Sequence, residues 1–160
     1  MIKILVILGL LAAAGVMLYV RFTPSDPELW HVDPRAASRP DTPNSWLIRP
    51  VGGDAPSPEF ALTAPELAAL VDEVVLAQPR TRRLAGSVEA GHMTYVARTP
   101  LMGFPDYVSI RVFATATGAS LAVFSRARFG QSDLGVNRKR VEDWLAAIDA
   151  AVREKEAGDG

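Results

Sequence analysis

The chain has 160 residues, of which 49% are hydrophobic and 22% charged, and its formal net charge is −1. The length fits one globular domain with extensions, and the near-neutral charge argues against a protein devoted to nucleic acid, which carries a basic excess over a whole face. The sequence has no cysteine, which excludes disulfides, thiolate metal sites and a thiol nucleophile.

Residues 1–22, MIKILVILGLLAAAGVMLYVRF, predict a transmembrane anchor. No charged or strongly polar residue occurs from Ile4 to Val20, so the segment approaches the roughly 20 residues that cross a hydrocarbon core. A cleaved signal needs a small-residue cleavage site after a shorter apolar run, whereas Ala12-Ala13-Ala14 is followed by more apolar chain. The pattern favours an uncleaved signal-type anchor, with residues 4–22 in the bilayer, over a cleaved signal or a buried core helix.

The charges that flank this segment give conflicting signals for its orientation. Lys3 precedes the apolar run, while Arg21, Arg35 and Arg39 follow it, and positive charge tends to stay on the cytoplasmic side. The very short tail before the run is typical of a signal-type anchor. We therefore expect a single-pass protein of the inner (plasma) membrane, with its soluble domain on the periplasmic side.

Residues 23–58 hold eight of the twelve prolines and predict a tether that is partly docked on the domain. Proline fixes φ and removes a hydrogen-bond donor, which excludes regular helix and central strand. Trp30, His31 and Trp46 argue against full exposure of this stretch. Packing of the tryptophans on the domain is favoured, with interfacial anchoring of Trp30 as the alternative.

Residues 59–155 predict an α+β domain, with 156–160 as a disordered tail. TAPELAALVDEVVLAQP has a capping box, Thr63 with Glu66, before apolar residues at helical spacing. The period then changes to two in RRLAGSV, HMTYVAR, DYVSIRVFA and ASLAVFSRAR, which predict strands. A second helix follows, with an apolar stripe that includes Val141, Trp144 and Ile148. The expected fold is an antiparallel sheet of four to five strands flanked by two helices.

Alternation in the last two predicted strands determines which side chains share a face. A short loop centred on Thr117-Gly118 places Val112 opposite Val123 on the core side. The other face is then expected to meet solvent. On that face the same register pairs Arg111 with Phe124, Ser109 with Arg126 and Tyr107 with Arg128, which predicts cation–π contacts for the first and last of these pairs.

The stretch SRARFGQSDLGVNRKR, residues 125–140, gathers five cationic side chains and one acid. Cations in the first turn oppose the positive end of a helix dipole, which flags a possible site. One hypothesis is an anion-binding surface for a phosphate, sulfate or carboxylate. The alternative is a solvated or internally paired cluster, because acids stand four residues after Arg138 and Lys139 and because Ser132 or Asp133 suits an earlier cap. Both remain open, and the hypothetical site comprises Arg111, Arg126, Arg128, Arg138, Lys139 and Arg140.

The same stretch, together with PLMGFPDYVSIRV before it and PNSW upstream, resembles the bacterial family known as domain of unknown function 1499. The shared pattern is a serine–arginine pair, a glycine and an S-D-L-G-x-N-R-K-R-x-E run, and it covers roughly residues 42–148. The resemblance implies a small bacterial domain, often behind a membrane segment or signal, with no assigned activity and no assigned catalytic residues.

The sequence contains few motifs that indicate catalysis or cofactor binding. His31 and His92 are the only histidines, far apart in the sequence and without metal-ligand spacing, so each is interpreted as a turn or surface residue. No nucleophile elbow or phosphate-binding loop occurs, and Asp106 and Asp133 are interpreted as ion-pair or turn partners. We therefore expect no cofactor and no metal.

The sequence favours a non-enzymatic binding or structural module of the cell envelope, whose partner is an acidic lipid, polymer or protein. Nucleic acid is not an expected partner, because an anchored domain outside the cytoplasm would not meet it. The alternative is a small-ligand or lipid carrier, or an enzyme of unknown reaction, that uses a pocket near Met102 and Phe104.

Overall fold

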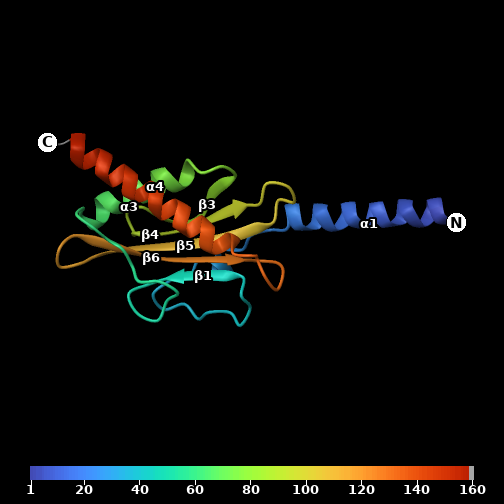
Figure 1. Ribbon diagram of the computed structural model, residues 1–160, viewed down its shortest axis with the longest axis horizontal. Helices are drawn as coiled ribbons and strands as arrows, with labels where there is room; N and C mark the ends of the chain where they lie inside the picture. The colour runs from blue at the N-terminus through green and yellow to red at the C-terminus, as the bar shows by residue number, and fades with distance from the viewer. Residues whose placement is uncertain (159–160) are drawn as a thin grey trace.

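Helix α1, Ile2–Phe22, projects from one end of the protein, and an α+β domain follows it (Figure 1). The computed structural model describes residues 1–158. Within these residues α1 is the one helix long and apolar enough to cross a membrane, a test that a signal sequence also passes. Nearly all of its side chains are exposed, so the domain does not use α1 as a core helix.

The domain is built on an antiparallel sheet in the order β1-β6-β5-β4-β3, with β2 paired to β6 beyond the end of β1. This confirms the predicted fold class. The bounds of the strands are β1 Ser45–Ile48, β2 Glu59–Phe60, β3 Thr81–Ser87, β4 His92–Arg98, β5 Pro105–Ala114 and β6 Ala119–Ala127. The four strands predicted from alternation correspond to β3 through β6.

Helices α3, Ala64–Leu76, and α4, Val136–Gly158, cover one face of the sheet (Figure 1). The predicted capping box is present, because Thr63 accepts from the Glu66 amide and Glu66 accepts from the Thr63 amide. The helices enclose the main core, which includes Val71, Ile110 and Ile148. Because α4 continues to Gly158, residues 156–158 of the predicted disordered tail are helical, and 159–160 lie outside the described residues.

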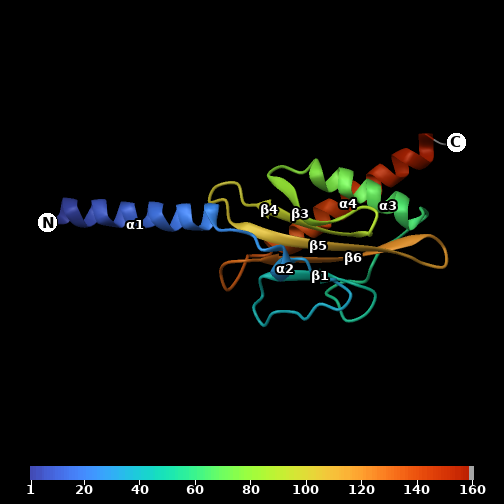
Figure 2. The same cartoon turned by 180° about the vertical axis from the view of Figure 1, so that it is seen from behind.

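The other face of the sheet is covered by residues 23–44, which we call the strap (Figure 2). Its short helix α2, Pro27–Trp30, lies over β5 and β6. The Trp30 ring stacks on Tyr107 with 3.9 Å between ring centroids, and Tyr107, Phe124 and Arg126 are all buried. The expectation that this face meets solvent is therefore wrong, because the strap covers it.

Strand β1 lies inside the stretch predicted to be a tether. It pairs with β6 at the edge of the sheet, from Ser45 opposite Arg126 to Ile48 opposite Val123. Only one side of an edge strand needs ladder hydrogen bonds, so flanking prolines are tolerated there. The folded domain therefore begins well before Phe60.

The register of the β5–β6 hairpin differs from the predicted one by two residues. Val112 pairs with Leu121, and the four-residue loop Thr115–Gly118 joins the strands. Gly118 falls at the end of this loop because β2 passes beside it, where any Cβ would collide with the Phe60 carbonyl oxygen. A shift of two residues preserves which side chains share a face.

The register shift changes the cross-strand partners of the predicted cation–π pairs. Tyr107 lies opposite Arg126, and Ser109 lies opposite Phe124. The cation–π contact to Phe124 comes from Arg126, at 4.6 Å from the ring centroid, and not from Arg111. Arg128 meets Tyr107 through a hydrogen bond to its hydroxyl group instead.

The contacts of Trp30 predict that this residue stabilises the packing of the strap on the sheet. Trp30→Ala removes both the stack on Tyr107 and the cation–π contact with Arg126, so we expect it to lower the free energy of unfolding by about 2 kcal/mol. Leu29→Ala is the matched control, because Leu29 is its neighbour and is 68% exposed. Thermal unfolding of the full chain in neutral detergent measures both variants, and equal effects would contradict this role of Trp30.

Candidate functional site

The structure places the six predicted anion-site residues on opposite faces of the sheet. Arg126 and Arg128 follow the face of β6 that the strap covers, and Arg111 lies on the same face of β5. Arg138, Lys139 and Arg140 lie in the first turns of α4, on the other face. The six cations therefore do not form one surface.

The arginines of the strap face bind parts of the protein itself. Arg126 donates to the Trp30 carbonyl oxygen at 2.9 Å, and its burial lowers the pKa of the guanidinium to about 10. Arg128 donates to the Pro24 carbonyl oxygen at 2.6 Å and to the Tyr107 hydroxyl at 3.1 Å. Charged donors strengthen such hydrogen bonds. These two side chains fasten the strap to the sheet.

Two of the α4 cations form the exposed pairs that their spacing predicts. Arg138 pairs with Glu142 at 2.7 Å, and Lys139 pairs with Asp143 at 2.8 Å. Asp133 caps the helix, because its carboxylate accepts from the backbone amides of Gly135 and Asn137. Its negative charge also offsets the conflict between the cations and the helix dipole.

Residues from the separate motifs meet in a buried polar network around Asn137. The Asn137 amide donates to the Asn44 carbonyl oxygen at 3.1 Å and to Asp133 at 2.7 Å. Its oxygen accepts from the Ser125 hydroxyl at 2.5 Å and from Arg140 at 2.9 Å. Asn137 and Ser125 are fully buried, so each bond replaces one to water that folding removes. The network joins strap, β6 and α4.

Arg140 continues this network to β5. Its Nη2 lies 2.6 Å from Asp106 Oδ2, and the two side chains are only 12% and 5% exposed. Burial raises the pKa of Asp106 above its ordinary value, and the positive charge of Arg140 opposes that rise. The interpretation of Asp106 as an ion-pair partner is therefore correct.

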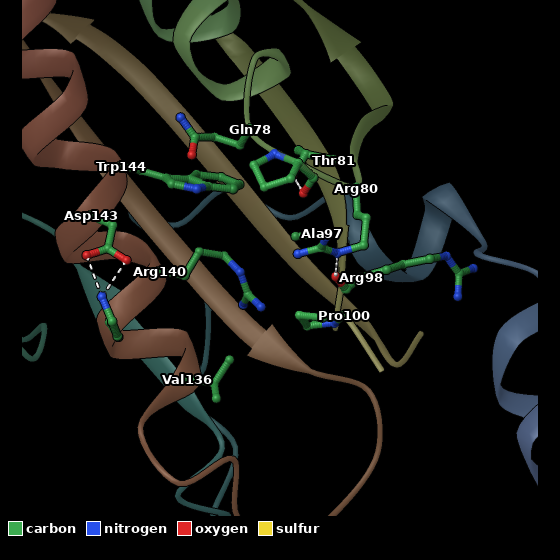
Figure 3. Close-up of a pocket in the computed structure, with 12 residues that line it drawn as sticks. Gln78, Arg80, Thr81, Ala97, Arg98, Pro100, Val136, Arg140, Asp143 and Trp144 are labelled. Atoms are coloured by element: carbon green, nitrogen blue, oxygen red, sulfur yellow. Dashed lines mark hydrogen bonds and ion pairs between the residues drawn. The ribbon is translucent and has the colours of Figure 1, made fainter. Parts of the chain in front are cut away.

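Beside this ion pair, a pocket of about 270 Å³ opens between the start of α4 and the turn after α3; we call it the basic pocket. Figure 3 shows the Arg80 side chain extending into the pocket toward the α4 side, where Arg140 lies, whereas the Arg98 side chain turns away toward α1. The Arg140 guanidinium itself is directed to Asp106 and Asn137. Lys139, Asp143 and Trp144 line the same pocket.

Arg80 differs from Lys139 and Arg140, the cations that α4 contributes to the basic pocket. No ion pair of the described residues involves it, and its Nε donates to the Arg98 carbonyl oxygen at 3.2 Å. Its φ is +57°, a left-handed conformation that disfavours residues other than glycine and that recurs at functional sites. The sequence carries no signal for this residue, because its relevance depends on how the turn places it.

A second pocket, of about 290 Å³, lies on the other side of the Arg140–Asp106 pair; we call it the apolar pocket. Phe104, Phe129, Ala127 and Val136 supply its apolar walls. Of the two residues at which a pocket was predicted, Phe104 lines it and Met102 does not.

The two histidines lie together, although the sequence separates them. The His31 and His92 rings stack with 3.9 Å between centroids, where the strap crosses β4. His31 bonds the Thr94 hydroxyl at 2.8 Å, and His92 bonds the Val32 carbonyl oxygen at 3.1 Å. Both are half-buried and lie at the ends of elements, as turn or surface residues do, but the sequence did not predict that they contact one another. Among residues 1–158, no group of three or more potential ligands is arranged to hold a metal ion.

The fold and the apolar helix define the class of this protein. It is an α+β domain with a strap on one face of its sheet, two helices on the other, and an N-terminal helix with the length and composition of a membrane span. Within this class, the chain belongs to the family described as "Protein of unknown function (DUF1499)", which matches residues 48–148. The match covers more than half of the chain and confirms the resemblance. No curated protein matches the chain.

The buried ion pair predicts a difference between neighbouring cations of α4. Arg140→Ala leaves the Asp106 carboxylate buried without its partner, so we expect a loss of about 3 kcal/mol in the free energy of unfolding. Lys139→Ala is the matched control, because it removes an exposed pair worth less than about 1 kcal/mol. Chemical unfolding of the full chain compares the two, and a loss in Lys139→Ala as large as that in Arg140→Ala would contradict this assignment.

The histidine stack predicts a pH dependence of stability. Burial lowers the pKa of both rings, and His92 and Arg111 lower that of His31 further, while Asp33 opposes the effect at His92. A depressed pKa means that the unfolded chain binds the proton more readily, so the stabilisation is complete above the ordinary value of 6.5 and is lost as the pH falls below it.

We therefore expect the melting temperature of the full chain to fall between about pH 7 and pH 5. The double variant His31→Phe, His92→Phe keeps two stacked rings that cannot be protonated, so its melting temperature should fall less. Parallel pH profiles for the two proteins would contradict the contribution of the stack.

Proposed function

We propose that the protein is a membrane-anchored, non-enzymatic module of the bacterial cell envelope that binds an anionic ligand in the basic pocket. The observation that carries this proposal is Arg80, whose charge faces the pocket and has no carboxylate partner among residues 1–158. A guanidinium presents several donors in a fixed plane, which suits phosphate, sulfate or carboxylate oxygens.

The charge balance of the basic pocket supports an anion. Lys139 is matched by Asp143, and Arg140 is matched by Asp106. Arg80 and Arg98 have no ion pair among the described residues, and because the Arg98 side chain turns away to the Gly103 carbonyl oxygen, Arg80 supplies the unpaired positive charge. A ligand oxygen beside Arg80 would also reduce the repulsion between Arg80 and Arg140, two cations that line the same pocket. The basic pocket therefore favours a ligand with one negatively charged group.

The walls of the basic pocket support an amphiphilic ligand. Trp144, Pro79, Pro100 and Val136 supply apolar surface beside the cations, and Val136 also lines the apolar pocket. Few, well-placed polar groups in a mainly apolar cleft are typical of small-molecule sites. The class of ligand we propose is a small amphiphile with an anionic headgroup, such as an acidic lipid.

This proposal keeps part of the anion-site hypothesis and revises the rest. Lys139 and Arg140 remain in it, and Arg80 joins them. Arg111, Arg126 and Arg128 lie on the strap face, where Arg126 and Arg128 bind carbonyl oxygens of the strap, and Arg138 binds Glu142. We propose that α1 is a single-pass anchor in the inner membrane with the domain on the periplasmic side, and the length and composition of α1 support its role as a membrane span.

A lipid carrier is a second candidate function, and the apolar pocket is the observation that favours it. Phe104 and Phe129 lie with ring centroids 6.1 Å apart along its wall, close to the end of α1 where Tyr19 contacts Phe129. A pocket of about 290 Å³ is small for a whole lipid, but it suits one end of an acyl chain.

Substitution of Arg80 tests the proposed function. The probe is dodecyl phosphate, titrated calorimetrically into the full chain in a neutral detergent. We expect Arg80→Gln to weaken binding about tenfold, because one charge-assisted contact contributes about 1.5 kcal/mol or more. The matched control is Arg82→Gln, two residues away on β3 but outside the pocket lining. Equal affinities of the two variants, or no binding by the unsubstituted chain, would overturn the proposal.

A further inference from the structure

We propose that the end of the domain next to α1 enters the interface of the bilayer that α1 crosses, through Leu101 and Leu134 at the tips of two loops. The inference rests on the membrane anchoring proposed above, and it adds a second, independent contact with the lipid. The loops are residues 99–104, between β4 and β5, and residues 128–135, between β6 and α4. Figures 1 and 2 show both loops at the end of the domain from which α1 projects.

The exposed side chain of Leu134 contributes no buried apolar surface to the stability of the fold. Its side chain is 94% exposed, and its φ is +53°, a conformation that disfavours a bulky residue. Hydrogen bonds hold the backbone there, because the Leu134 amide donates to the Ser132 hydroxyl and Asp133 binds the amides of Gly135 and Asn137. An apolar side chain that is held outward on a fixed loop indicates a contact outside the protein.

Leu101 extends from the other loop in the same way, and it is 85% exposed. The base of its loop is closed by the bond from the Thr99 amide to the Phe104 carbonyl oxygen, and Arg98 donates to the Gly103 carbonyl oxygen at 2.7 Å. Gly103 packs against the Arg21 side chain of α1, which a Cβ at this position would approach to 3.3 Å. This contact places the loop against the last turn of α1.

The contacts with α1 also determine where the loops lie along the helix axis, and therefore relative to a bilayer that α1 crosses. The Phe129 ring lies 6.3 Å from the Tyr19 ring, and Tyr19 precedes the end of α1 at Phe22 by three residues, which is about 5 Å along the axis. A helix of 21 residues is about 32 Å long, close to the thickness of the hydrocarbon core. With α1 across a bilayer, Phe129 therefore lies at the level of the interface.

The charges at this end of the domain fit an interface with lipid headgroups. Arg21 is exposed beside the loops, Arg98 directly precedes the loop 99–104, and Arg128 begins the loop 128–135. The loop 99–104 contains no acidic residue, and the one acid of the loop 128–135, Asp133, is directed to backbone amides. Apolar tips with cations behind them are typical of surfaces that bind anionic membranes.

Single cysteines test the inference directly, because the chain has none of its own. Leu101→Cys and Leu134→Cys are labelled with the fluorophore NBD. Ala116→Cys is the matched control, because Ala116 is exposed in the β5–β6 loop at the end of the domain opposite α1. The full chain is reconstituted into vesicles of phosphatidylethanolamine and phosphatidylglycerol that contain a lipid with a nitroxide near its headgroup.

We expect the nitroxide lipid to quench the labels at positions 101 and 134 at least about threefold more than the label at position 116, since only the first two lie within the interface. Resistance of the protein to alkaline extraction from the same vesicles measures the anchoring by α1 separately. Anchored protein with equal quenching at all three positions would overturn the inference and would assign the two leucines to a protein partner. Extraction of the protein would overturn the anchoring on which the inference rests.

Discussion

The hydrogen bonds of the Asn137 side chain hold the start of α4 to the strap and to the sheet. Asn137 belongs to α4, and its partners are Asn44 at the end of the strap, Ser125 on β6 and Asp133 in the loop between β6 and α4. Arg140 extends the same network to Asp106 on β5. Because the site is buried, each polar group requires its partner, so the loss of one side chain leaves polar groups of the other elements without a hydrogen bond. The start of α4 is therefore fixed, and the basic pocket is built beside it.

The density of arginine in the stretch 125–140 has two separate explanations, one on each face of the sheet. On the strap face, Arg126 lies between the rings of Trp30 and Phe124 and binds a carbonyl oxygen of the strap. On the helix face, Arg140 balances a buried carboxylate. Alternation places Arg126 and Arg128 on the same, strap-covered face of β6. The later cations belong to α4, which covers the opposite face, so residues that are continuous in the sequence serve two different purposes. Arg80, on which the proposed anion site depends, lies outside this stretch.

The parts of the structure that local patterns determine were predictable from the sequence. The capping box at Thr63, the alternation of β5 and β6 and the pairs of Arg138 and Lys139 each depend on residues within one element or its neighbour. The contacts that were missed join distant segments: Trp30 and Arg126 are 96 residues apart, and the register of the hairpin depends on Phe60 beside Gly118. The tryptophans indicated that residues 23–58 pack on the domain, but no periodicity indicates which residues they contact. The partners of the strap, the histidine stack and the position of Arg80 are therefore known only from the structure.

The docking of the strap has a consequence for the position of the domain relative to a membrane. A free proline-rich segment of this length would let the domain move tens of ångströms from the surface. Instead, Thr23 is buried directly after α1, Tyr107 binds Ser25, and Arg128 binds Pro24. The chain therefore has no free tether between α1 and the sheet, and an anchored domain is held against the bilayer. The basic and apolar pockets share Val136 at the start of α4, near the α1 end. With α1 anchored as proposed, a ligand that is itself part of the membrane would reach them without leaving the lipid surface.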